Sequence, residues 1–253
     1  MASQESINEI KGSIGKLTYY KERTIGFLLK RKSEVTAQRM KTDPVFQRTR
    51  ENGTEFGLAG TAGKTLRKSI HTLLLHVRDM KRVARLVKLI MHIALTTDTT
   101  SVRGQRQLAN GDSTLLNGFN FNSLALLEEV FYAPFSVIID RVAGTITTNI
   151  ASFVPIDKLL APLGATHFKV LMSGSEIDFA GHTFNTDNQE TAILPWDGTA
   201  TALINSVATV TAGTTLPLFA YLGVQFYEMV NGNYYPLSSG KYNALGIVKV
   251  DQV

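Results

Sequence analysis

Residues 43–69, DPVFQRTRENGTEFGLAGTAGKTLRKS, set the helical architecture of this chain. The stretch opens with Asp43, a residue type that caps helices, and Pro44, which suits the first helical position. Glycines then follow at intervals of four, three and three residues, a helical period that places them on one face: Gly53, Gly57, Gly60 and Gly63. A glycine costs a helix about 1 kcal/mol relative to alanine. Four on one face therefore predict that another surface packs very close to it.

The helical pattern continues after the glycines. Apolar residues keep i, i+3/i+4 spacing from residue 62 to 77 and again from 83 to 95. The segment Arg78-Asp79-Met80-Lys81 between the two stripes contains neither glycine nor proline. Both a tight helical hairpin and one continuous helix fit, and we adopt the hairpin. The first helix is expected to run from Pro44 to about Val77, with a break near Gly53 as an alternative.

Residues 11–33, KGSIGKLTYYKERTIGFLLKRKS, are typical of a β-hairpin. Two short apolar runs flank the polar KERTIG segment, whose glycine suits a turn. A two-stranded hairpin is marginally stable alone, so it needs a surface to pack on. Two alternatives stay open: it joins the core of its own domain, or it is an arm that docks on another subunit by strand addition. The contact residues of such an arm are Leu17, Tyr19, Phe27 and Leu29.

From Phe131 onward the sequence is typical of β-structure. It contains about seven short runs separated by Gly, Asn and Pro. The expected architecture is therefore an antiparallel β-sandwich, immunoglobulin-like or similar. Together with the helices, this makes the expected fold class α+β. Asn231-Gly232 is the strongest hairpin signal, since this pair suits a type I′ turn. Asn122 is expected to cap a short helix through Val130, with Leu124, Leu127 and Val130 inward. The predicted strands cover residues 135–140, 145–150, 167–172, 202–210, 216–229, 234–237 and 244–250.

Charge divides the chain into two unlike parts. Residues 1–110 contain 21 Lys+Arg and 9 Asp+Glu, whereas residues 111–253 contain 5 and 12, so a net +12 is followed by a net −7. This split predicts a basic hairpin-plus-helical region, 1–110, and an acidic β-sandwich domain, 111–253. The helical part carries a basic face that could contact a partner copy or a polyanion: Lys64, Arg67, Lys68, Arg78, Lys81, Arg82, Arg85 and Lys88.

Three roles fit this basic face: a solvated helix surface, a contact with the acidic part of another copy, and nucleic-acid binding by helices 62–95. A head-to-tail contact between copies is heterologous and, when repeated, builds a ring or a filament. Proteins that bind single strands usually interleave aromatic residues with the charges, and none occurs between Phe56 and Phe119. Contact with duplex phosphates does not need them.

The sequence predicts no catalytic, cofactor or metal site. It has no cysteine, which excludes disulfides and thiolate ligands. The segment Gly57–Thr65, GLAGTAGKT, approaches a phosphate-binding P-loop, but its first glycine comes one residue early and no buried strand precedes it. The five histidines lack the spacing of metal ligands. We therefore expect a protein that is not an enzyme and uses no cofactor.

The N-terminal segment MASQESINEIKGSIG lacks the apolar core of a signal peptide. The most apolar run, residues 86–95, is too short to cross a bilayer. We expect synthesis in the cytoplasm without a Sec signal and no membrane span. The final location stays open, and an extracellular or particle-associated one fits the sequence as well.

Several stretches resemble a family of uncharacterised proteins encoded by bacteria of the Bacteroidota. They are KTDPVFQRTRENGTEFGLAGTAGKTLR, SVRGQRQ, PLFAYLGVQFYEMVNGNYYPL and the closing YNALGIVKV. The resemblance covers most of the chain, including the early GSIGKLTYYK. It implies that the N-terminal and C-terminal parts form one unit, and it transfers no activity and no site residue.

The charge split, the arm, the glycine face and the lack of a catalytic motif predict a structural subunit. It would assemble with other copies of itself into a filament, tube or shell. Two alternatives stay open: a nucleic-acid-binding protein that uses the basic helices 62–95, and a carbohydrate-binding or adhesive module. The aromatic platform of such a module would be Trp196, Tyr227, Tyr234 and Tyr235.

Overall fold

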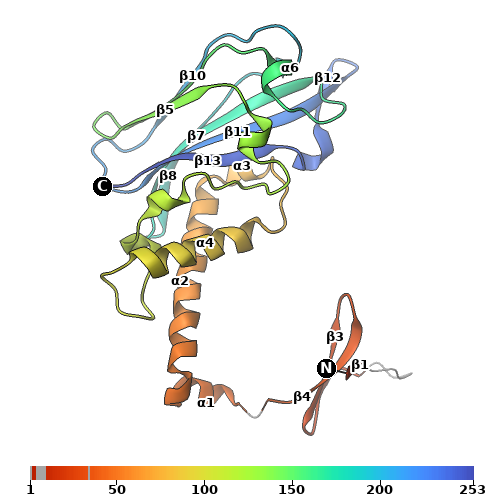
Figure 1. Ribbon diagram of the computed structural model, residues 1–253, viewed down its shortest axis with the longest axis vertical. Coiled ribbons are helices and arrows are strands. Elements are labelled where there is room, and N and C mark those ends of the chain that lie inside the picture. Colours follow the sequence, from red (N-terminus) through yellow and green to blue (C-terminus); the bar gives the residue numbers. More distant parts are fainter. Residues whose placement is uncertain (1, 4–9, 34) are drawn as a thin grey trace. The chain divides into compact units, whose positions relative to one another are not determined.

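The computed structural model describes residues 2–3, 10–33 and 35–253 and has a mixed α+β fold (Figure 1). The chain divides into two compact units, residues 1–50 and 51–253. We call them the arm unit and the body. This division lies well before residue 110, because the helices of the basic region share one hydrophobic core with the large sheet.

The arm unit is a small antiparallel sheet followed by short helical turns. Its strands lie in the order β1-β4-β3-β2, so the predicted hairpin, β3 paired with β4, is confirmed within a larger sheet. Asp43 Oδ1 accepts a hydrogen bond from the Val45 amide at 3.0 Å and caps the turn that begins at Pro44. The elements are β1 Ala2–Ser3, β2 Gly12–Ile14, β3 Leu17–Glu22, β4 Gly26–Arg31, α1 Ala37–Thr42 and a 3-10 turn Pro44–Phe46.

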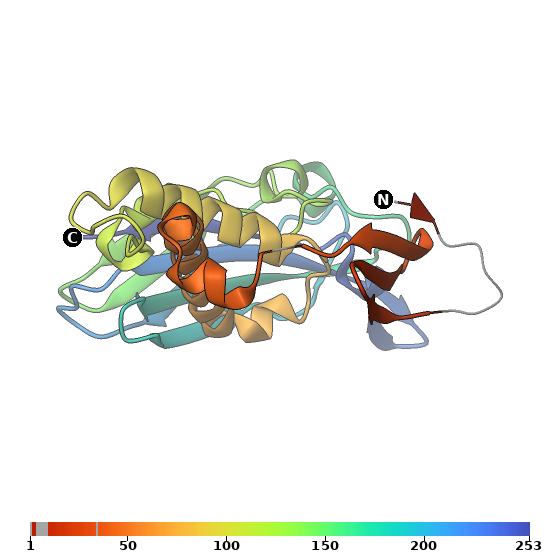
Figure 2. The same cartoon turned by 90° about the horizontal axis from the view of Figure 1, so that it is seen from below.

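Three helices follow: α2 Gln47–Ser69, α3 His71–Leu74 and α4 Arg82–Thr97. Helix α2 is continuous through Gly53, so the alternative of a break there is wrong. Residues 75–81 are not helical, so one continuous helix through both apolar stripes is wrong. The expected first helix, Pro44 to about Val77, is also too long, because α2 ends at Ser69 and α3 is a separate short helix. In both views α4 crosses α2 at a steep angle, on the same side of the large sheet (Figure 1 and Figure 2).

The large sheet of the body is antiparallel and centred on β11 Leu218–Val230. Strand β11 pairs with β7, β13 and β12. In the turn that follows β11, Asn231 and Gly232 have φ angles of 51° and 80°. The predicted type I′ turn requires positive φ at both positions. The remaining strands of this sheet are β7 His167–Asp178, β8 Thr183–Glu190, β9 Leu194–Pro195, β12 Asn233–Pro236 and β13 Ala244–Asp251.

A second sheet of three strands packs on the face of the large sheet opposite the helices (Figure 1). Both faces of β11 are therefore buried: Phe219 and Tyr221 lie in the helical core, whereas Leu222 and Val224 lie in the core on the other side. This explains why β11 is apolar almost throughout, because only doubly covered strands lack polar alternation. The small sheet has the order β10-β6-β5, with β5 Phe135–Asp140, β6 Thr145–Ile150 and β10 Ile204–Thr209.

The seven predicted strands are all present, and β8 is the long strand that the sequence pattern did not predict. Its residues, TFNTDNQE, are polar and mostly exposed, so no apolar alternation marks it. The short helices are α5 Leu127–Val130, α6 Pro155–Lys158 and the 3-10 turns Leu108–Asn110, Ser113–Leu116 and Leu237–Gly240.

The expected cap of α5 is wrong. Asn122 Oδ1 accepts from the Leu124 amide, which makes a local turn, and α5 begins only at Leu127. The Leu127 amide instead donates to Asn120 Oδ1 at 2.8 Å. Leu124 is 66% exposed rather than inward, whereas Ala125, the next residue, is buried.

Across the described ranges, no helix has both the length and the apolar character that a bilayer crossing requires.

Candidate functional site

The arm unit presents an apolar face. The pairing Tyr19↔Leu29, with Leu17 and Phe27 at alternate positions, places all four predicted arm residues on the same side of the sheet. Within residues 10–33 and 35–50, Leu28 alone is buried, and it lies on the opposite side. The described part of this unit thus has a face of large side chains with almost no core of its own.

Cations border this apolar face. The ammonium of Lys21 lies 4.8 Å from the centre of the Phe27 ring, and that of Lys11 lies 5.9 Å from it. Residues 1–50 contain 11 Lys+Arg and 5 Asp+Glu. The arm unit therefore carries positive charge beside an apolar surface, which suits a partner surface that is acidic and partly apolar.

The predicted glycine face is helical but only partly packed. A side chain at Gly63 would meet Val87 and Ile90 of α4 at 3.4 Å. At Gly53, Gly57 and Gly60 it would meet nothing within 4 Å. Of the four glycines on this face, only Gly63 is therefore packed within the described chain. The other three leave the surface of the outer part of α2 without side-chain cover.

A buried acid fixes this part of α2 to the segment that follows α4. Glu55 is 3% exposed and accepts bonds from Arg106 Nε at 2.7 Å, Arg106 Nη2 at 3.1 Å and the Gly104 amide at 2.8 Å. Hydrogen bonding from Arg106 lowers the pKa of Glu55 and outweighs the opposing effect of burial. The sequence analysis missed this pair, because its members are 51 residues apart.

The structure separates the eight predicted basic residues into distinct surroundings. Four of them line a cavity of about 210 Å³ together with His71, namely Lys64, Arg67, Lys68 and Arg82. We call it the Arg67 pocket. Arg78 and Lys81 line a different cavity, of about 410 Å³, beside the exposed Met80. Arg85 is engaged inside the body, and Lys88 is exposed on α4 outside both cavities.

The Arg67 pocket is lined by cations with no acidic side chain among its lining residues. Arg82 Nη1 donates to the carbonyls of Val77 at 2.8 Å and Leu74 at 3.2 Å, so backbone acceptors hold its guanidinium in place. Arg67 Nη1 is buried and, among the described residues, has no hydrogen-bond acceptor. Burial, followed by repulsion from Arg82, lowers the pKa of Arg67. The arrangement favours a bound anion.

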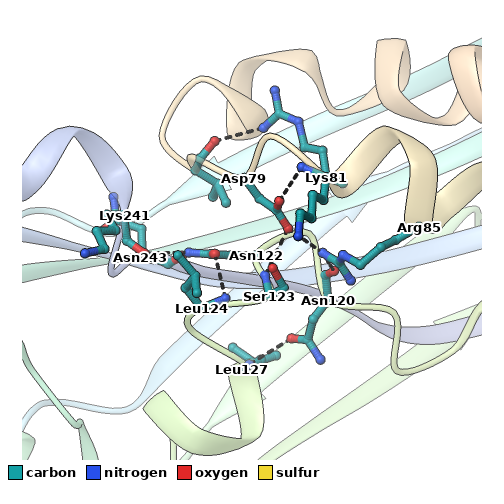
Figure 3. A network of polar contacts seen from close by, with 12 residues as sticks. Asp79, Lys81, Arg85, Asn120, Asn122, Ser123, Leu124, Leu127, Lys241 and Asn243 are labelled. Carbon is teal, nitrogen blue, oxygen red and sulfur yellow. Dashed lines mark hydrogen bonds and ion pairs between the residues drawn. The ribbon is translucent and has the colours of Figure 1, made fainter. Parts of the chain in front are cut away.

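A polar network next to the second cavity uses Asp79 as its centre (Figure 3). Asp79 accepts from the Lys81 amide at 2.6 Å, from Arg85 Nη2 at 2.7 Å and from the Ser123 amide at 3.1 Å. Burial alone would raise the pKa of Asp79, but these bonds outweigh it and lower that pKa to about 2. Arg85 also donates to the Asn120 carbonyl at 2.8 Å, so this predicted contact residue serves the fold.

Asparagines continue the network to the sheet (Figure 3). Asn122 Nδ2 donates to the carbonyls of Lys241 and Asn243 at 2.8 and 2.9 Å. Asn243 Nδ2 donates to the His76 carbonyl at 2.7 Å, and its Oδ1 accepts from the Phe226 amide at 3.1 Å. These side chains satisfy backbone groups where α3, the loop before α5 and β11 meet, which is a structural role.

The remaining chemical motifs do not assemble into a site. The P-loop-like segment lies entirely within α2 and follows no strand, so it cannot form the loop that wraps a phosphate. Within the described residues, no group of three or more His, Asp or Glu side chains is placed to hold a metal ion.

The proposed aromatic platform is also not formed. Tyr227 is 8% exposed and belongs to the sheet interior. Trp196 packs against the core and its Nε1 donates to the Leu159 carbonyl at 3.3 Å. Tyr234 and Tyr235 are exposed neighbours on β12, so their rings point to opposite faces. The four rings therefore share no exposed surface.

Comparison of the chain with protein-family models, with curated proteins and with solved structures found no match.

Proposed function

We propose that this protein is a non-enzymatic structural subunit that assembles with other copies of itself into a filament, tube or shell. The observation that carries this proposal is the arm unit: its apolar face has large side chains, yet the described part of the unit buries only Leu28. A sheet is stable when a second layer covers its apolar face. The covering layer that we propose is the surface of another copy.

Charge supports a second copy as that partner. The arm unit lies in the basic part of the sequence, and residues 111–253 carry a net −7. An arm that docks on the acidic part of a neighbour makes a heterologous contact, which repeats to give an open or closed assembly. Because the contact pairs unlike charges, the association rate and the affinity of the two copies are expected to fall as the salt concentration rises.

We also propose that the acidic part is a β-sandwich, immunoglobulin-like or similar, to whose large sheet the helices add a further layer. The support is a cluster of buried residues between the small and large sheets, formed by Ile146, Ala208, Leu218 and Ala220. Such a core would keep the fold of each subunit unchanged when its arm unit docks on a neighbouring copy.

The assembly proposal is tested on the full chain by light scattering and negative-stain imaging at low and high salt. We expect large regular particles at low salt and smaller ones at high salt. The double variant Leu17→Ser with Leu29→Ser should remove two of the four large side chains of the apolar face and leave monomers. The control Lys30→Ser changes the opposite face of the same strand and should still assemble. A monomer of 27.8 kDa at every salt concentration would falsify the proposal.

A further inference from the structure

The Arg67 pocket concentrates positive charge around a small, half-open depression. Its cavity of about 210 Å³ is lined by Lys64, Arg67, Lys68, His71 and Arg82, and the other lining residues are apolar: Leu74, Leu75 and Val83. Cations on a helical surface normally point into water or pair with carboxylates. Here four of them face a common cavity.

One of these groups is fixed before any ligand arrives. The bonds from Arg82 Nη1 to the Leu74 and Val77 carbonyls set the position of one guanidinium. Arg67 reaches back along α2 toward Gly63, where Nη1 lies 3.8 Å from the position of an added Cβ. At that distance an added methyl would make only ordinary contact with Arg67, and the tighter neighbours of Gly63 are Val87 and Ile90 of α4.

The buried nitrogen of Arg67 has an unmet requirement. A buried charge without a partner is unfavourable, and a second guanidinium nearby makes it more so. Within the part of the chain that the structure describes, no acceptor reaches Arg67 Nη1, and no acidic residue lines the cavity. Nη1 has almost no accessible surface, so an oxyanion in the cavity would not reach that atom directly. Beside the guanidinium groups of Arg67 and Arg82 it would reduce the repulsion between their charges.

We propose that the Arg67 pocket binds one small oxyanion of the phosphate class, either inorganic phosphate or the terminal phosphate of a larger molecule. Guanidinium groups match the tetrahedral oxygens of phosphate by paired hydrogen bonds. Pockets for drug-sized ligands begin near about 300 Å³, so this cavity holds an anion rather than a nucleoside. No Phe, Tyr or Trp ring lines it, and His71 is the one ring among its lining residues, so the large platforms on which bases usually stack are absent. The site is independent of the assembly proposed above.

The test measures binding of inorganic phosphate to the full chain by calorimetry, with ionic strength held constant by sodium chloride. Wild-type protein is expected to bind phosphate and to show a higher thermal midpoint in phosphate than in matched chloride. Arg67→Met should weaken binding at least tenfold. The control Lys88→Gln removes an exposed cation outside the cavity and should bind like the wild type.

A second readout separates a binding site from a general charge effect. Without phosphate, Arg67→Met should raise the thermal midpoint, because it removes a guanidinium nitrogen that is buried without an acceptor among the described residues and keeps an apolar stem. If Arg67→Met does not fold, the pair Lys64→Gln with Lys68→Gln, both at exposed positions, should weaken phosphate binding several-fold. The proposal is overturned if phosphate acts no more strongly than chloride, or if the variants that fold bind phosphate as the wild type does.

A competition experiment distinguishes the source of the phosphate and tests the nucleic-acid alternative. A short oligonucleotide with a 5′-phosphate should displace inorganic phosphate if the pocket accepts terminal phosphates. The same oligonucleotide without that group should not. Equal displacement by both would mean that the cavity belongs to a surface for the nucleic-acid backbone, and this outcome overturns the discrete site.

Discussion

At the scale of single residues, the arginines of the basic region differ in what they contact. Arg85 and Arg106 are bound to the acids Asp79 and Glu55, at 2.7 Å in each case. Arg67 and Arg82 face a cavity without an acid. The few acids of the helical region therefore decide which cations are structural and which remain able to bind a ligand. A count of charges along the sequence cannot separate these two groups.

Asp79 makes part of the stability of the body depend on pH. Its pKa falls from 3.8 to about 2 on folding. A carboxylate with a depressed folded pKa contributes stability that is present above the unfolded pKa and is lost as pH falls through the folded pKa. We expect about 2 kcal/mol of the free energy of unfolding to disappear between about pH 4 and pH 2 from this group.

Asp79→Asn tests this contribution. The variant should lower the free energy of unfolding at pH 7 by about 2 kcal/mol, because it replaces charge-assisted hydrogen bonds by weaker ones. Urea titrations at pH 7 and pH 2.5 should give a smaller difference between the two pH values for the variant than for the wild type. Asp157→Asn, at an exposed position on α6, serves as the control. An unchanged pH dependence in Asp79→Asn would show that other acids carry the effect.

At the scale of elements, α2 has two different parts. From Ala59 onward its apolar side lies in the helical core, whereas Gly53, Gly57 and Gly60 border open space. Phe56 lies among these glycines and is 57% exposed. Glycines lower the stability of a helix, and at these exposed positions no contact within the described chain offsets that cost. Contact with a neighbouring copy is the role that agrees with the proposed assembly.

A pair of identical substitutions separates an open glycine from a packed one. Gly60→Ala should raise the free energy of unfolding by about 1 kcal/mol, since the new methyl meets nothing and alanine favours helix. Gly174→Ala should lower it by about 2 kcal/mol, because its Cβ would lie 2.8 Å from that of Ala208 in the small sheet. Chemical denaturation of both variants measures the difference.

Assembly provides the second measurement on the same variants. If the glycine face contacts a neighbour, Gly60→Ala should reduce particle formation while it stabilises the subunit. Unchanged assembly with increased stability would leave these glycines without a role in the particle. Gly174 lies between the two sheets, so its effect on assembly should follow its effect on folding.

At the scale of the whole molecule, the chain consists of two units with different means of stability. The body encloses cores on both faces of its large sheet. The arm unit buries Leu28 and no other side chain within residues 10–33 and 35–50. A small unit with so little buried area is marginal by itself. The two units should therefore respond differently to truncation.

Deletion of residues 1–33 tests this difference. We expect a soluble protein with the helical circular dichroism and the cooperative unfolding of the body, because residues 51–253 form their own compact unit. Light scattering should find monomers where the full chain forms particles. An insoluble or unfolded deletion variant would mean that the hairpin belongs to the core of its own chain, which is the alternative that the sequence left open.

Local signals in the sequence predicted much of the fold. The apolar periods of α2 and α4, the hairpin of β5 and β6 and the Asn231-Gly232 turn are all present. In each case the structure is determined by residues that are close in sequence, either through a helical period of apolar residues or through a turn that needs positive φ. The charge split was equally visible, because it needs only a count along the chain.

Tertiary structure decided the features that depend on residues far apart. Strand β8 forms because β7 offers it an edge, although its own residues are polar and give no strand pattern. The helices belong with the sheet because their apolar sides close one face of β11. Among the described residues Arg67 Nη1 meets no acceptor, while Arg106 meets an acid 51 residues away. Burial and pairing act between segments that only the folded chain brings together. The sequence therefore identifies the basic residues, and only the tertiary structure shows which of them pair with acids.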